Sequence, residues 1–179
     1  MKIREALMEA SIRPEHVRCI LLTHPHLDHA GSAAEVKSLT RAEVIAHERS
    51  RAILETGARQ LPMTPTPGRL NKALFRMFVK DVLDPLVVVD HVAVDGEELF
   101  GLDGLKAIHS IGHIAFLSEE YGGVLFAGDA ASNTFGLRYA ISYEDFELGK
   151  KSLVKIAKHQ FAKACFGHGS VVHSFATPG

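Results

Sequence analysis

Hydrophobic positions along the chain switch between a spacing typical of helices and runs typical of strands. Ile3, Leu7 and Ala10 recur at helical intervals, which predicts a short amphipathic helix over 2–10. The apolar run at 17–22 (VRCILL) instead predicts a buried strand. The same alternation predicts a helix over 33–39 with an N-terminal cap at Ser32, a strand over 42–46 and a helix over 47–56. Strands that alternate with helices on this scale predict an α/β fold.

The second half of the chain is predicted to consist mainly of short strands with glycine-containing turns. The predicted strands lie at 86–94, 98–100, 104–109, 113–118, 123–127 and 161–166, with a helix after Ser142 and Asp145. Between the two halves, 57–68 carries three prolines and 69–83 has helical spacing. The segment 57–85 is therefore interpreted either as a lid over a pocket or as an ordinary linker-plus-helix insertion. Because there are no internal repeats, we expect a single domain over 1–179.

Composition narrows the class of protein. The 179 residues are 46% hydrophobic and 23% charged, which excludes a disordered chain, and the net charge of −1 argues against a nucleic-acid partner. The N-terminus has no signal-peptide pattern, and the apolar runs are too short to span a bilayer. The two cysteines form no metal or disulfide motif. These features predict a cytoplasmic protein without a membrane partner.

The strongest chemical signal is the concentration of histidine. The chain has 11 His, and His24, His26, Asp28 and His29 fall within six residues at the end of the first predicted strand. Alternate residues of an extended segment point the same way, so His24 and His26 can converge on one ion. Imidazole and carboxylate groups are ligands suited to zinc, iron or manganese. A solvated histidine-rich loop is the alternative, but the density of donors favours a metal site.

Two further donors follow predicted strands. Asp129 stands in Gly-Asp-Ala after an apolar strand, and His168 stands between two glycines after the last strand. Either residue alone is as consistent with a structural role as with a metal site. Their common position at the end of a strand, which His24 shares, favours a joint role in binding metal.

With these motifs, the chain resembles the metallo-β-lactamase superfamily of binuclear metallohydrolases. The resemblance rests on THPHLDHAG at 23–31, LFAGDAA at 125–131 and FGHG at 166–169. It implies an αββα sandwich that holds two divalent ions, zinc by expectation, with iron or manganese as alternatives. It assigns His24 and His26 to the first ion, Asp28, His29 and His168 to the second, and Asp129 to both.

The remaining ligand of the first ion is open between two histidines. The family usually has Pro-Gly-His-Thr-x-Gly-His before the Gly-Asp strand, and its first His is the ligand. This chain has AIHSIGH at 107–113, which places His109 in the ligand position and leaves His113 as the alternative. The strand could instead run straight through if a short deletion has removed the ligand.

A second departure concerns the N-terminus. Family members carry strands ahead of the first helix, and this chain begins inside that helix. Part of the first sheet is then expected to be missing, which would expose an edge strand. We expect a homodimer to cover this edge.

The resemblance implies hydrolysis of a small ester, lactone or thioester by a hydroxide that bridges the two metal ions, with Asp28 as the catalytic acid–base residue. One alternative is an oxidoreductase with a single iron that oxidises persulfides. Another is a truncated, non-catalytic remnant of the family.

Overall fold

The computed structural model describes residues 2–57, 63–78, 86–99, 101–102, 104–110 and 113–173. The chain divides into two units, each with its own sheet and hydrophobic core. Unit 1 comprises Met1–Arg59 and Leu83–Val92, and unit 2 comprises Gln60–Val82 and Ala93–Gly179.

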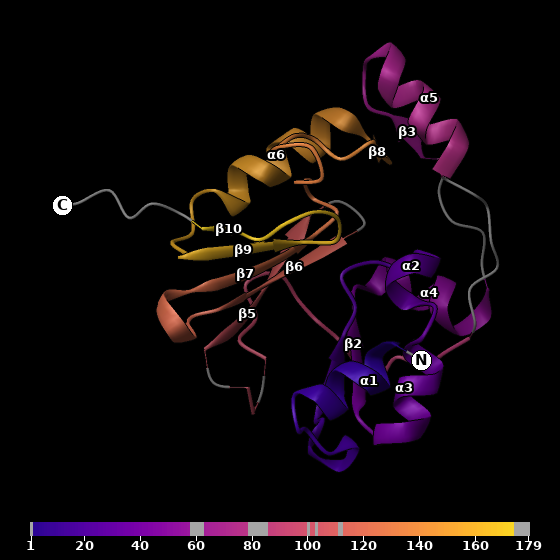
Figure 1. Cartoon of the computed structure of the whole chain (residues 1–179), viewed down its shortest axis with the longest axis vertical. Coiled ribbons are helices and arrows are strands. Elements are labelled where there is room, and N and C mark those ends of the chain that lie inside the picture. The colour runs from indigo at the N-terminus through magenta and orange to yellow at the C-terminus, as the bar shows by residue number, and fades with distance from the viewer. Residues whose placement is uncertain are drawn as a thin grey trace. The chain divides into compact units, whose positions relative to one another are not determined.

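Unit 1 is built on a small parallel sheet with the strand order β1-β2-β4. Its strands are β1 (Cys19–Leu21), β2 (Glu43–Ala46) and β4 (His91–Val92). Its helical elements are α1 (Lys2–Glu9), the 3-10 helix η1 (Pro14–His16), α2 (Leu27–Ala30), α3 (Ala33–Thr40) and α4 (Glu48–Thr56). Parallel neighbours need a crossover connection, and α2 with α3 supplies it between β1 and β2 (Figure 1). The helices and strands predicted up to residue 56 are thus confirmed.

The core of unit 1 lies between this sheet and its helices. Its buried apolar side chains are Leu22, Ala30, Ala33, Val44, Ala46, Leu54, Val87 and Val89. The prediction of a strand over 86–94 is wrong except at β4. The backbone amides of Val87 and Val89 donate to Leu54 O and Glu55 Oε1 of helix α4, and a bond to strand β2 follows only at Asp90, whose amide donates to Val44 O.

A carboxylate at the end of this segment holds the sheet to α3. Asp90 Oδ2 accepts hydrogen bonds from Lys37 Nζ at 2.6 Å and from the Val44 amide at 2.8 Å. Partial burial disfavours the charged carboxylate, but these two donors outweigh it and lower the pKa of Asp90. The ion pair therefore supports unit 1 mainly when Asp90 is ionised.

Unit 2 is built on a five-stranded mixed sheet with the order β10-β9-β7-β6-β5. Its strands are β5 (Leu105–Ser110), β6 (His113–Ser118), β7 (Val124–Gly128), β9 (Lys163–Phe166) and β10 (Val172–His173), and the 3-10 helix η2 (Glu120–Gly122) joins β6 to β7. The pairing of β7 with β9 is parallel, and the other pairs are antiparallel. Helix α6 (Phe146–Ile156) lies along one face of the sheet, where Ile156 joins the buried core (Figure 1).

Of the two helix N-terminal caps predicted from the sequence, the one before α6 is formed and the one before α3 is not. Asp145 caps α6, because its Oδ1 accepts a hydrogen bond from the Leu148 amide, whereas Ser142 lies in a strand. The side-chain cap predicted at Ser32 is not formed: Ser32 precedes α3 but makes no side-chain hydrogen bond to the helix.

The segment between the predicted halves packs within unit 2. Strand β3 (Thr64–Pro65) pairs with β8 (Ser142–Tyr143), and α5 (Arg69–Phe78) follows. The predicted helix over 69–83 is confirmed as far as Phe78, while 58–62 and 79–85 lie outside the described residues. Whether 57–85 acts as a lid stays a prediction. Among the described helices, none is both long and apolar enough to cross a membrane.

Candidate metal centre

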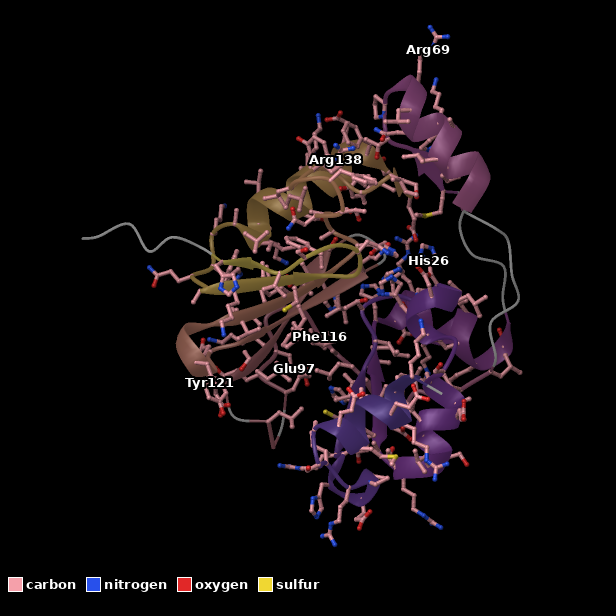
Figure 2. The ribbon with its side chains drawn as sticks, in the orientation of Figure 1. His26, Arg69, Glu97, Phe116, Tyr121 and Arg138 are labelled. Carbon is pink, nitrogen blue, oxygen red and sulfur yellow. The ribbon has the colours of Figure 1, made fainter. Side chains whose placement is uncertain are left out.

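Unit 1 presents its donors where β1 leaves the sheet. His24 is fully buried, and its ring packs against those of His26 and His29, with centroid distances of 4.5 Å and 3.9 Å. Thr23 Oγ1 lies 3.0 Å from His24 Nδ1. A hydrogen bond at one ring nitrogen fixes the orientation of the ring, as is usual for metal-ligating histidines. Local chain geometry thus gathers the three imidazoles, and Figure 2 shows His26 beside the start of α2.

Helix α2 places Asp28 and His29 next to each other. Asp28 Oδ2 lies 3.7 Å from His29 Nε2, and the Asp28 side chain is 58% exposed, whereas that of His29 is only 15% exposed. The helix is one turn long and is followed by Gly31, where an added Cβ would meet the carbonyl oxygen of Leu27 at 2.3 Å. The glycine therefore allows the tight turn that joins the donor segment to α3.

Unit 2 brings together the other two predicted donors, Asp129 and His168. They follow the parallel strands β7 and β9, whose carboxyl ends meet at one edge of the sheet. Asp129 Oδ2 lies 3.6 Å from His168 Nε2. Gly128 has a φ of 53° immediately before Asp129. The sequence prediction that both residues lie at strand ends is confirmed.

A buried tyrosine supports the chain after Asp129. The Tyr143 hydroxyl donates to the carbonyl of Ala130 at 2.8 Å and accepts from the Ala140 amide at 3.0 Å. Burial raises the pKa of this hydroxyl to about 12. Gly149 of α6 lies so close to the ring that an added Cβ would approach its Cδ1 to 2.6 Å. Sequence analysis missed this residue, because no local pattern links Tyr143 to Ala130.

The loop that carries His168 is fixed by a second residue that sequence analysis missed. The Asn133 amide donates to the His168 carbonyl at 3.0 Å, and Asn133 Nδ2 donates to Ser170 O at 2.8 Å. Gly169 has a φ of 98° and packs directly on the Asn133 backbone. The pairing of glycines around His168 was the only sequence signal for this close approach.

The structure places His109 and His113 on opposite faces of one hairpin. His109 pairs with Ile114, and Ser110 pairs with His113, so the β5 strand runs through His109 without a loop. His109 Nε2 lies 2.9 Å from Ala93 O, and the His109 amide donates to Asp95 Oδ1. His113 is buried on the other face. The structure therefore places His109 against Ala93. Because His109 and His113 lie on opposite faces of the hairpin, only one of them can face a metal ion on a given side of the sheet.

The donor set within each unit fits divalent metal ions. Unit 1 offers three imidazoles and a carboxylate, and unit 2 offers at least one imidazole and one carboxylate at 3.6 Å from each other. Imidazole and carboxylate suit zinc, iron and manganese, and no thiolate is required.

Comparisons with known proteins agree with this chemistry. The sequence model of the metallo-beta-lactamase superfamily matches residues 1–171. Among solved structures, the Cronobacter sakazakii (Enterobacter sakazakii) metallo-beta-lactamase with the HARLDQ motif is similar, at a TM-score of 0.67 and 23% identity. The match covers 93% of this chain and 64% of that one.

Two further structures share the fold. BJP-1, a subclass B3 metallo-beta-lactamase of Bradyrhizobium japonicum, matches at a TM-score of 0.63 and 22% identity, over 92% of this chain and 61% of that chain. TTHA1623, solved in a di-iron-bound form, matches at a TM-score of 0.61 and 22% identity, over 96% of this chain and 78% of that chain. This chain spans less than two thirds of the length of the two lactamases. The predicted fold class is confirmed, and the chain belongs to the metallo-beta-lactamase superfamily.

Proposed function

We propose that this chain is a metal-dependent hydrolase of a small ester, lactone or thioester. Membership of the superfamily supports a hydrolase-type function. The observation that carries the proposal is the packing of His24, His26 and His29 at the end of β1, beside the exposed carboxylate of Asp28. Apolar side chains would stabilise this part of the fold better than three packed imidazoles, because burying polar groups costs free energy unless they are paired. The packing of the imidazoles therefore favours a role in binding metal.

The proposed ligand set follows the resemblance. His24, His26 and His109 would hold one divalent ion, Asp28, His29 and His168 a second, and Asp129 would contact both. When bound, such ions supply Lewis acidity toward a carbonyl oxygen and toward water. Zinc is our first choice. Iron is the main alternative, since the similar TTHA1623 was solved in a di-iron-bound form.

His109 remains the proposed third ligand of the first ion. Its Nε2 atom lies against the Ala93 carbonyl, which is the kind of partner that orients a metal-ligating histidine whose other nitrogen binds the ion. His113 is the alternative, because Gly112 precedes it as glycine precedes the ligand in the family pattern. The two assignments differ in a measurable way, given below.

Asp28 is proposed as the residue that moves a proton. Its side chain is more than half exposed, so water and substrate can reach the carboxylate. From there it would orient the attacking water and pass a proton to the leaving oxygen or sulfur atom.

The experiment that tests this function measures metal content before activity. The purified chain is loaded with zinc or iron, the metal atoms per chain are counted, and esters, lactones and thioesters are screened for hydrolysis. We expect about two ions per chain and turnover that a chelator abolishes. A metal-free chain that takes up no ion would refute the proposal. Oxygen consumption with persulfide by an iron-loaded chain would replace hydrolysis with persulfide oxidation.

A further inference from the structure

A small hairpin extends from the chain directly after Asp129. Ser132 and Arg138 pair through both backbone hydrogen bonds, at 3.0 Å and 2.9 Å, and Thr134 bridges to Gly136. Gly136 has a φ of 85°, which allows the turn. Residues 132–138 therefore form a defined hairpin with Phe135 at its tip.

This hairpin is attached to the loop that carries His168. The Asn133 amide bonds to the His168 carbonyl, and the Asn133 side chain bonds to Ser170. Phe135 follows Asn133 by two residues, which span at most about 7 Å even when extended. The tip of the hairpin thus stays close to a proposed metal ligand of its own unit.

The hairpin carries large apolar side chains that face solvent. Phe135 is 74% exposed and Leu137 is 63% exposed. The neighbouring Tyr139 is partly covered, because its ring packs edge-on against Phe146 at 5.1 Å. Exposed apolar groups in one place are typical of surfaces that bind an apolar partner.

The tip is held in shape without being buried. Arg138 donates to the Phe135 carbonyl at 3.2 Å, and its guanidinium lies 5.9 Å from the centre of the Phe135 ring. Arg138, the last residue of this hairpin, is labelled in Figure 2. A surface with a fixed shape loses less conformational entropy when it binds a ligand.

We propose that Phe135 and Leu137 bind the apolar acyl chain of the substrate, so that the enzyme prefers a medium-length or longer acyl group. This inference rests on the proposed hydrolase function. Hydrolysis needs only the carbonyl group at the donors, which leaves the acyl chain free to contact the hairpin that is bonded to the His168 loop through the Asn133 amide. Each methylene buried on this surface raises affinity by a factor of about four.

The test compares p-nitrophenyl acetate with p-nitrophenyl octanoate on the metal-loaded chain. We expect kcat/KM for octanoate to exceed that for acetate. The double variant F135A/L137A should lower kcat/KM for octanoate about tenfold and change that for acetate less than twofold, with the same metal content. Tyr121→Ala is the matched control, because Tyr121 is an 85% exposed aromatic in η2, between β6 and β7 (Figure 2). An equal loss for both esters, or the same loss in the control, would overturn the inference.

A binding measurement separates this inference from the proposed function. Calorimetric titration with the free carboxylates octanoate and acetate measures binding affinity without turnover. If neither ester is hydrolysed, the proposed function fails, while tighter octanoate binding that F135A/L137A weakens would still support the surface. Equal binding of octanoate to wild type and variant would refute it. A wild-type dimer that the variant converts to a monomer, with unchanged chain-length preference, would instead assign the hairpin to self-association and refute acyl binding.

Discussion

The candidate donors of the two units are built in different ways. In unit 1, His24 to His29 follow one another along a strand end and a single helical turn, so the local backbone brings the side chains together. In unit 2, Asp129 and His168 meet because β7 and β9 are parallel neighbours, with Tyr143 and Asn133 fixing the loops. The first group depends on local geometry and the second on the packing of an entire sheet. Substitutions should therefore affect the two groups differently.

The largest effect is expected from Asp129→Ala compared with His26→Ala. The resemblance assigns Asp129 to both ions and His26 to one. We expect Asp129→Ala to remove nearly all bound metal. The variant should also lower kcat/KM by about 10³-fold, because charge stabilisation worth several kcal/mol is lost. His26→Ala should leave about one ion per chain.

Elemental analysis of both variants, together with circular dichroism to show that they fold, checks this prediction. Equal metal loss in the two variants would mean that Asp129 has no special role.

His109 and His113, in the hairpin formed by β5 and β6, give the next largest effect. If His109 binds the first ion, His109→Ala should lower the metal content by about one ion per chain and His113→Ala should not. Ser110 and His113 share one face of the hairpin and His109 lies on the other, so the two variants act as matched controls. Loss of metal in His113→Ala alone would transfer the role to His113. Loss in neither variant would mean that the first ion has only the two ligands of unit 1 and Asp129.

Sequence reasoning succeeded where the structure is local. The strand over 17–22 and the candidate donors after it follow from an apolar run and a short motif, and Asp129 and His168 were correctly predicted to follow the ends of their strands. It failed where distant segments decide the outcome. Val87 and Val89 bond to α4 and not to a strand, and the supporting bonds of Tyr143 and Asn133 reach residues that no spacing predicts. The His109 segment was ambiguous because its spacing fits either a loop or a continuous strand.

A glycine comparison tests how strictly the packing of unit 2 fixes the His168 loop. A Cβ at Gly169 would lie 2.1 Å from the carbonyl carbon of Asn133, whereas a Cβ at Gly96 would meet nothing within 4 Å, although both glycines have positive φ. Gly169→Ala should cost about 3 kcal/mol, from backbone strain plus the clash, and Gly96→Ala only about 1 kcal/mol. Urea unfolding midpoints measure the difference. Similar midpoints would show that the loop moves freely.

The smallest effect is expected from Asp90, which supports unit 1 away from the donors. Because the folded-state pKa of Asp90 lies below its ordinary value of 3.8, its contribution is present above about pH 4 and is lost as the pH falls through the lowered value. The Asp90 side chain is 35% exposed, which limits the effect, so Asp90→Asn should cost only about 1 kcal/mol at pH 7. Near pH 2 the cost should be smaller. Lys37→Met should behave in the same way, while Lys151→Met, at an exposed lysine of α6, serves as the control. Unfolding midpoints at both pH values test this, and an Asp90→Asn cost that does not change with pH would mean that the carboxylate contributes by shape and not by charge.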